Sequence, residues 1–156
     1  MTSDFTIVID NREQKPYTFQ NIKPEPPQTI TQGLKTGDYS IMGLENKICI
    51  ERKEKSDLFN SMGKNRDRFK KEIIRMSEFD YAGLVIETSL AGIFTNPPSR
   101  SQMSSKAVFR SLISFSIKQG VHVWPMWSRE SAEKATYLIL KRYWDNCLEG
   151  KNWNAT

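Results

Sequence analysis

Short β-branched runs and stretches with helical spacing of apolar residues follow one another along this chain of 156 residues. The β-branched runs predict five strands, at residues 5–9, 39–41, 47–53, 81–87 and 121–125. Apolar residues that recur at helical spacing predict helices at 56–62, 66–79, 104–119 and 128–146. The proline-rich segment 16–27 predicts an irregular loop between the first two strands.

The predicted helices begin and end at residues with suitable capping chemistry. Side chains that can accept hydrogen bonds from the first free N–H groups of a helix stand at Ser56 or Asp57, at Ser104 or Ser105, and at Ser128. Gly63 interrupts the first helical stretch, and Gly120 follows the third helix, where glycine can adopt left-handed backbone angles. With the stretch 56–79 taken as one helical region, the element order is β-β-β-α-β-α-β-α.

That order predicts an α/β fold with a mixed sheet of about five strands flanked by helices. The first three strands can pair antiparallel, and two strand–helix crossovers follow them. No internal repeat or linker divides the chain. We therefore expect a single domain over residues 1–150 and a loosely ordered tail at 151–156.

Composition narrows the classes of protein that fit. Hydrophobic residues make up 38% and charged residues 26%, which is typical of a soluble globular protein. No apolar run is long enough to span a bilayer, and residues 1–4 do not begin a signal peptide, so we expect an intracellular protein without a membrane partner. Two cysteines and one histidine are too few for a disulfide scaffold or a Cys/His zinc site. A metal would therefore bind to carboxylates, which favours Mg²⁺ or Mn²⁺.

Basic residues concentrate in two segments of a chain whose net charge is +5. Between Glu51 and Arg75 there are nine Lys/Arg and five Asp/Glu, and between Asn96 and Gly120 there are four basic residues and no acidic ones. Segments of this kind can contact a phosphate backbone. A solvated helix face would have the same composition, so charge alone leaves both interpretations open.

One pattern of charged residues indicates specific chemistry. Glu51 and Lys53 lie two apart on a predicted strand, so their side chains leave the same face of the sheet. Asp38 opens the preceding strand, and a hairpin between the two strands would bring it near Glu51. Two converging carboxylates can hold a divalent cation through oxygen ligands, and the Arg52 carbonyl is a plausible further ligand.

Hydrolysis of a phosphodiester needs residues of these types. A carboxylate-bound Mg²⁺ can lower the pKa of a water molecule and polarise the phosphate, while the Lys53 ammonium orients that water or stabilises developing charge. Asp10 and Glu13 add a further acidic pair at the end of the neighbouring strand, where Asp10 could support the metal or the water. The alternative is a solvent-facing strand with alternating charges.

These residues also resemble a known family. The run Gly37-Asp38, then Glu51-Arg52-Lys53, then Asp57 resembles the GD…ERKxxxD signature of the XPF-type structure-specific endonucleases, and residues 9–13 resemble that family's opening V-D-x-R-E strand. The resemblance covers residues 6–146. It implies a restriction-endonuclease-like fold, dependence on Mg²⁺ or Mn²⁺, cleavage of branched or flapped DNA, and pairing of nuclease domains.

Two features depart from the family pattern. The interval from Asp38 to Glu51 is longer than usual, through the turn at residues 42–47. No tandem helix-hairpin-helix domain follows the nuclease motif in this sequence. Since such a domain helps to select the DNA structure, the resemblance supports nuclease activity more strongly than structure specificity.

Further residues have two interpretations each. Arg12, Arg52 and Glu13 could touch phosphate or support the metal site, or they could form structural ion pairs. By resemblance Asp57 is the family's last acidic position, although it could simply cap a helix. Phosphate contacts or a solvated helix start would both explain the basic residues beside the site, namely Lys64, Arg66 and Arg68, and likewise Lys106 and Arg110. We expect Cys49 to be a packed thiol and His122 to be structural.

The last predicted helix carries more apolar residues than a narrow stripe requires, which indicates either deep burial or a homodimer or heterodimer interface. We therefore expect a metal-dependent DNA endonuclease that uses Asp10, Asp38, Glu51 and Lys53 in repair or recombination. A junction resolvase, a restriction-type nuclease, and a non-catalytic DNA-binding or partner-stabilising module of the same fold are the alternatives.

Overall fold

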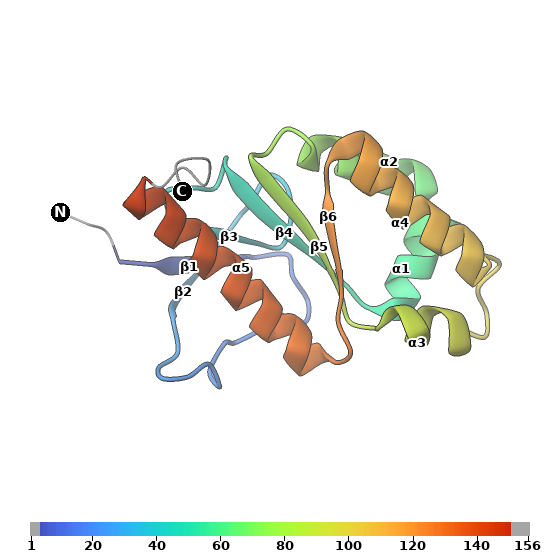
Figure 1. The fold of residues 1–156 in the computed structure, drawn as a ribbon, viewed down its shortest axis with the longest axis horizontal. Helices are drawn as coiled ribbons and strands as arrows, with labels where there is room; N and C mark the ends of the chain where they lie inside the picture. The colour runs from blue at the N-terminus through green and yellow to red at the C-terminus, as the bar shows by residue number, and fades with distance from the viewer. Residues whose placement is uncertain (1–3, 151–156) are drawn as a thin grey trace, which may run out of the picture.

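A computed structural model describes residues 4–150 and confirms an α/β fold built on one mixed sheet (Figure 1). The predicted tail at 151–156 lies outside the described residues. The sheet has six strands rather than about five: β1 (Thr6–Asp10), β2 (Gln28–Gln32), β3 (Tyr39–Ile41), β4 (Ile48–Lys53), β5 (Tyr81–Ile86) and β6 (His122–Pro125).

The strands lie in the order β2-β1-β3-β4-β5-β6, and only β3 runs against the others. The antiparallel pairing expected among the early strands is confirmed for β1 with β3 and for β3 with β4. Because β3 alone is reversed, the carboxyl ends of the other five strands meet the start of β3 at one edge. We call this the carboxyl edge of the sheet.

Helices cover both faces of the sheet (Figure 1). One face packs against α1 (Lys55–Met62), α2 (Arg66–Met76), α3 (Leu90–Thr95) and α4 (Ser105–Gln119). The other face packs against α5 (Arg129–Glu149) and the loop through Tyr17 and Ile22. No helix within residues 4–150 combines the length and the apolar content needed to cross a membrane.

The strand register decides which side chains reach which face. Ile9 pairs with Tyr39 and Tyr39 pairs with Ile50, and all three pack in the core beneath α5. Side chains alternate along a strand, so the residues next to these three point toward α1 and α2. Those neighbours are Asp10, Asp38 and Glu51.

Two elements were not expected from the sequence. Strand β2 lies between the predicted loop at 16–27 and the predicted strand at 39–41, where no element was predicted. Its sequence QTITQ has no apolar face, and at this outer position of the sheet it stays largely exposed. Helix α3 is a short helix capped by Ser89, whose side chain accepts a hydrogen bond from Gly92 N.

Several predicted helix ends are confirmed, whereas α2 ends at Met76 and not at 79, α5 extends to Glu149, and the start of α1 is wrong. The Ser104 side chain caps α4, Ser128 forms a capping box with Ser131 at α5, and Gly120 ends α4 in the left-handed region. Helix α1 begins at Lys55, before both expected caps, with Glu54 at its N-cap and no side-chain hydrogen bond. Neither Ser56 nor Asp57 caps it, because both already lie inside its first turn.

Gly37 allows the chain to enter β3 at the correct place. Its φ of +83° is in the left-handed region, and a Cβ atom there would lie 3.1 Å from Cys49 Cβ and 3.2 Å from Ile50 O. Two separate reasons therefore favour glycine at this position: the backbone conformation and the close approach of β4.

Gly37→Ala should destabilise the protein more than Gly43→Ala. Gly43 has a similar φ of +87°, but a Cβ there would meet nothing within 4 Å. Alanine at this position would therefore be destabilising only through its backbone conformation. We expect a loss of about 1–2 kcal/mol in the free energy of unfolding for Gly43→Ala, and roughly 1–3 kcal/mol more for Gly37→Ala from overpacking. Urea denaturation measures both; equal losses would mean that β4 yields to the extra methyl group.

Candidate active site

A polar cleft of about 590 Å³ opens at the carboxyl edge, between the sheet and α2. It is lined from β1, the loop before β3, the end of β4, and both helices that follow. The structure thus brings most of the sequence-predicted residues to one place: Asp10, Arg12, Glu13, Asp38, Glu51, Arg52, Lys53, Asp57 and Arg68. The lining residues that were not expected include Glu72 and Arg75 on α2.

Asp38 is fixed by backbone hydrogen bonds on both sides. Its carbonyl accepts a hydrogen bond from Asp10 N at 2.8 Å, and its own N–H donates to Ile50 O at 2.8 Å. Its Oδ2 accepts from Arg52 N at 2.8 Å. The longer interval between Asp38 and Glu51 therefore leaves the hairpin geometry intact, because the additional residues form the turn at Gly43.

Glu51 is 7% exposed and lies on the same face as Lys53. Its carboxylate lies within hydrogen-bonding reach of the Glu72 carboxyl, and the Lys53 ammonium stands 3.9 Å from Glu51 Oε1. Lys53 also lies over the Phe69 ring, 4.9 Å from its centre, which holds the ammonium inside the cleft.

Burial raises the pKa of both strand carboxyls. For Asp38, burial is the main cause, the Arg52 N–H opposes it, and the charges of Glu13 and Glu72 add to it, so the pKa rises to about 7. For Glu51, burial raises the pKa well above its ordinary range, and the charges of Asp38 and Glu72 add to the effect. The ionised forms of these carboxyls are thus costly in the protein alone.

Glu72 is the main residue that the sequence analysis missed. It lies on α2, lines the cleft, and brings its carboxyl within hydrogen-bonding reach of Glu51. The sequence contained a weak signal, since Arg68, Glu72 and Arg75 recur at helical spacing beside the apolar stripe of α2. Charged residues on a helix are usually solvated, so the spacing alone did not single them out.

Asp10 lines the cleft but already has several hydrogen-bond donors. Its Oδ1 accepts from Leu34 N at 2.9 Å, and its Oδ2 accepts from Arg12 Nε at 3.0 Å. Arg12 also donates to Leu34 O at 2.6 Å. Asp10 and Arg12 therefore tie the loop before β3 to the end of β1, and Arg12 keeps a side chain that is 69% exposed at the mouth of the cleft.

Arg52 points to the opposite face from its neighbours in the sequence, into a buried ion-pair network. It donates to both carboxylate oxygens of Glu13, at 3.1 and 3.0 Å, and to Glu87 Oε1 at 2.9 Å. Glu87 also accepts from Tyr17 and Arg129. Burial would lower the pKa of Arg52, but hydrogen bonds and charges from Glu13 and Glu87 raise it above its ordinary value. The side chain therefore joins β4 to the segments that carry Glu13 and Glu87.

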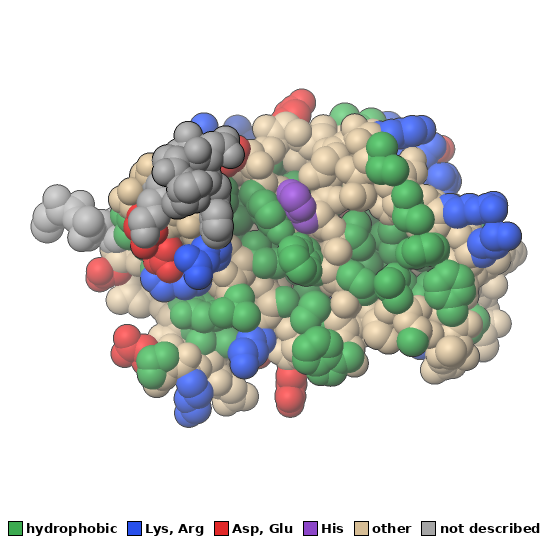
Figure 2. All heavy atoms as spheres, in the orientation of Figure 1, with side chains coloured by type: hydrophobic (Ala, Val, Ile, Leu, Met, Phe, Trp, Pro, Cys, Tyr) green, Lys and Arg blue, Asp and Glu red, His purple; other side chains and the backbone are tan. Residues whose placement is uncertain are grey.

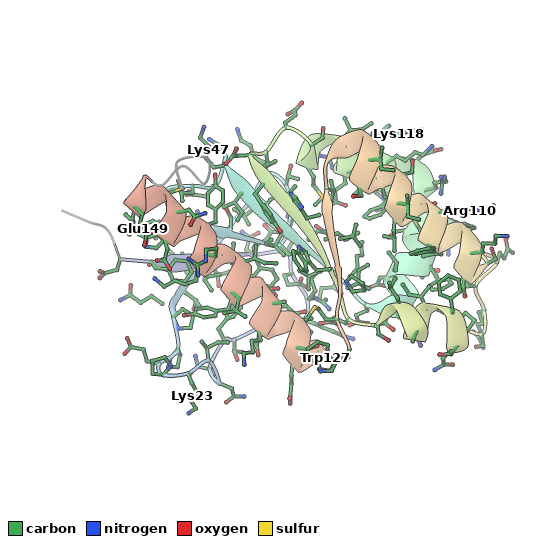
Figure 3. The ribbon with its side chains drawn as sticks, in the orientation of Figure 1. Lys23, Lys47, Arg110, Lys118, Trp127 and Glu149 are labelled. Carbon is green, nitrogen blue, oxygen red and sulfur yellow. The ribbon has the colours of Figure 1, made fainter. Side chains whose placement is uncertain are left out.

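The predicted basic residues separate into two groups. Arg68 lies at the rim of the cleft with an exposed side chain. Arg66 instead donates to Met62 O and Ser111 Oγ, which joins α1 to α4, and Lys64 is exposed outside the cleft lining. Lys106, Arg110 and Lys118 lie on α4, away from the cleft, and the last two are marked in Figure 3.

The other two singled-out residues lie outside the cleft lining, Cys49 in the core and His122 exposed on β6. Cys49 is fully buried, and burial together with the charge of Glu51 raises the pKa of its thiol, which disfavours a nucleophilic thiolate. His122 stacks on Tyr81 with ring centres 4.4 Å apart.

The groups that could hold a metal are the carboxylates of Asp38 and Glu51 and the Arg52 carbonyl. The Arg52 N–H donates to Asp38, and N–H and C=O of one strand residue point to the same side, so that carbonyl faces the Asp38 side as well. All three are hard oxygen donors. Among residues 4–150, however, no three Asp, Glu, His or Cys side chains are already gathered around one point as a metal site.

Replacing Arg52 should destabilise the fold, because the change leaves Glu13 and Glu87 buried without their partner. We expect Arg52→Ala to lower the free energy of unfolding by about 3–5 kcal/mol. Lys15→Ala is the matched control: it removes a pair with Glu54 whose lysine is 63% exposed, and should cost less than about 1 kcal/mol. Urea denaturation distinguishes a structural ion pair from a phosphate contact. An Arg52 variant of native stability that had lost DNA binding would indicate phosphate contact.

Comparison with known proteins identifies the family. The model of the ERCC4 domain matches residues 9–139 of this chain. Two structures of XPF from Aeropyrum pernix have a similar fold: one with a TM-score of 0.71 and 16% identity, covering 88% of this chain and 61% of that one. The other, described as a complex with DNA, has a TM-score of 0.62 and 17% identity, covering 94% and 66%. No curated protein sequence matches.

This chain therefore spans less than two thirds of the length of either XPF chain. The family match, by contrast, extends from the end of β1 into α5 and includes every strand and helix that lines the cleft. The chain belongs to the ERCC4 domain family and has the fold of an XPF-type nuclease domain.

Proposed function

We propose that this domain is a Mg²⁺- or Mn²⁺-dependent endonuclease that hydrolyses phosphodiester bonds in DNA. The observation that carries the proposal is the convergence of Asp38, Glu51 and Lys53 in one cleft, from two strands paired at the carboxyl edge. Membership of the ERCC4 domain family supports the same reaction class.

The donor set fits a hard divalent cation. Glu51 is buried and Asp38 half-buried, and burial together with the charge of Asp38 raises the pKa of Glu51, so a cation between them would offset both the burial and the repulsion. The Arg52 carbonyl would add a neutral oxygen ligand. A bound Mg²⁺ or Mn²⁺ would lower the pKa of a water molecule and polarise the scissile phosphate.

Lys53 would act on the phosphate rather than on the metal. Its ammonium is held by Glu51 and by the Phe69 ring, with a side chain that is 17% exposed. In that position it can orient the attacking water and stabilise negative charge as it develops on the phosphate oxygens. Asp10 would support the site by fixing the loop that carries Asp38, and Asp57 would complete the acidic lining on the side of α1.

DNA would be held by the basic rim of the cleft. Arg12, Arg68 and Arg75 all line the cleft with exposed side chains, so they can reach a phosphate backbone without breaking the core. One of the similar XPF structures is described as a complex with DNA, which supports DNA as the substrate. The resemblance of the motif to structure-specific endonucleases favours branched, flap or fork DNA, in repair or recombination inside the cell.

Two rivals remain on the same scaffold. A non-catalytic DNA-binding module would bind forked DNA and cut nothing with either metal, although Asp38, Glu51 and Lys53 are all present in this chain. A junction resolvase would make symmetric paired nicks in a four-way junction, and a restriction-type nuclease would cut plain duplex at a fixed sequence.

Glu51→Gln should strongly slow cleavage while the fold is kept. The change removes a metal-binding charge but keeps the side-chain shape, and a loss of several kcal/mol of transition-state stabilisation corresponds to about a thousandfold slower cutting. Labelled duplex, flap, fork and four-way-junction DNA with Mg²⁺ or Mn²⁺ measure the rate, and Glu78→Gln, an exposed acid outside the cleft, is the control. Metal-dependent cutting that survives in Glu51→Gln would rule out this site.

We also propose that two copies of the domain pair through α5 and β6. Burial accounts for Ala132, Leu140 and Trp144 of α5, but Leu138 is 53% exposed and Trp124 is 42% exposed. A mainly apolar groove of about 690 Å³ joins these two elements, and hydrophobic side chains gather on this face of the molecule (Figure 2).

A second copy suits this groove better than an acidic or a basic partner. Its rim carries both signs of charge, Lys141 and Arg142 beside Asp145, and a two-fold interface needs each patch to complement itself. Trp127 stands nearby at the turn before α5, 76% exposed (Figure 3).

Leu138→Glu should make the protein monomeric. Ile74→Glu is the matched control, because Ile74 is 54% exposed on α2, outside the groove, and Leu138 is 53% exposed within it. We expect sedimentation velocity to detect dimers for the wild type and for Ile74→Glu, and monomers for Leu138→Glu, since a buried unpaired charge opposes association. A monomeric wild type at all concentrations would contradict the proposed dimer.

A further inference from the structure

Helix α2 turns a charged stripe toward the cleft. Arg68, Glu72 and Arg75 lie three and four residues apart, so they share one side of the helix, and all three line the cleft. The adjacent stripe anchors the helix in the core through buried apolar side chains, namely Phe69, Ile73 and Met76. The position of Glu72 is therefore set by the packing of α2 and not by a flexible loop.

Glu72 faces the buried carboxylate of Glu51. Glu51 is 7% exposed and opens to the same cleft. Its near neighbours are the Lys53 ammonium, 3.9 Å away, and the Glu72 carboxyl, within hydrogen-bonding reach. Two ionised carboxylates cannot satisfy each other, because both only accept hydrogen bonds.

We propose that Glu72 is a third carboxylate of the metal site, provided by α2 opposite the two carboxylates of the sheet. The inference rests on the proposed function, since it concerns the same cation as Asp38 and Glu51. These three side chains are not gathered around a common point in the structure. Glutamate has three side-chain torsions, so Glu72 can turn its carboxylate toward that point while its backbone stays in place.

A third carboxylate changes the charge balance of the site. Asp38 and Glu51 alone would neutralise a divalent cation, whereas Glu72 adds a negative charge that increases affinity for the cation. The exposed Arg68 and Arg75, one turn away on either side, then lie where they would meet the phosphates of a bound strand. On this interpretation α2 contributes to the metal site and to the DNA surface together.

The inference can be tested by measuring the metal affinity of the intact chain. Isothermal titration calorimetry with Mn²⁺, in the absence of DNA, gives this affinity. Glu72→Gln keeps the size of the side chain and removes its charge, and we expect Mn²⁺ to bind about 10- to 100-fold more weakly. Glu78→Gln removes one negative charge just beyond α2, outside the cleft, and should leave the affinity unchanged. Glu72→Asp should recover part of the loss, because it restores the charge on a shorter side chain.

Thermal stability without metal separates this role from a structural one. If Glu72 is a metal-directed carboxylate, Glu72→Gln should melt at the wild-type temperature or above, since it removes a like charge beside the buried Glu51. Wild-type Mn²⁺ affinity together with a lowered melting temperature would assign Glu72 to the structure and overturn the inference. Loss of Mn²⁺ binding in Glu51→Gln but not in Glu72→Gln would overturn it while leaving the proposed function intact, whereas a wild type that binds no Mn²⁺ would overturn both.

Discussion

The pairing of the reversed strand β3 between β1 and β4 is the constraint on which the candidate site depends. Asp38 stands where β3 begins, and two backbone hydrogen bonds, from Asp10 N and to Ile50 O, fix it between the two neighbouring strands. Gly37 makes this possible because no other residue could take its backbone conformation while β4 lies so close. A single reversed strand thus brings an acidic residue at its start beside the acidic residue near the end of its neighbour, although thirteen positions separate Asp38 from Glu51 in the sequence.

Buried charges are paired with opposite charges on one face of the sheet, whereas on the other face like charges lie close together. Beneath α5, Arg52 satisfies Glu13 and Glu87 with short hydrogen bonds, and Tyr17 and Arg129 satisfy the remaining oxygen of Glu87. Beneath α2, the carboxylates of Asp38, Glu51 and Glu72 lie close to one another, with Lys53 as the neighbouring cation. Burial raises the pKa of Asp38 to about 7. A protein selected only for stability would not keep the second arrangement, because uncompensated burial of charge is costly. Such local cost is typical of functional sites, where a ligand offsets it.

The sequence predicted the sheet, most helix boundaries and the convergence of Asp38 with Glu51, because all three depend on local periodicity or on a short hairpin. It did not predict β2, whose polar sequence becomes a strand only through its pairing with β1, a contact between distant segments. Glu72 was missed for a similar reason: its helix was recognised, but which side of α2 faces the cleft depends on how Phe69 and Ile73 pack against the sheet. The role of Arg52 stayed open in the sequence since its partners Glu13 and Glu87 come from two other segments.

Alternation along β4 explains why three consecutive charged residues occur in this order. Glu51 and Lys53 point to the cleft, where a carboxylate can hold a cation and a compact ammonium can approach a phosphate. Arg52, between them, must point to the other face, where its planar guanidinium can bind Glu13 through two parallel hydrogen bonds and still reach Glu87. Lysine could not make that set of contacts, because its ammonium lacks the planar fork of donors. The motif Glu-Arg-Lys therefore combines a site and its support within one strand, and the same backbone also directs the Arg52 carbonyl to the side of Asp38.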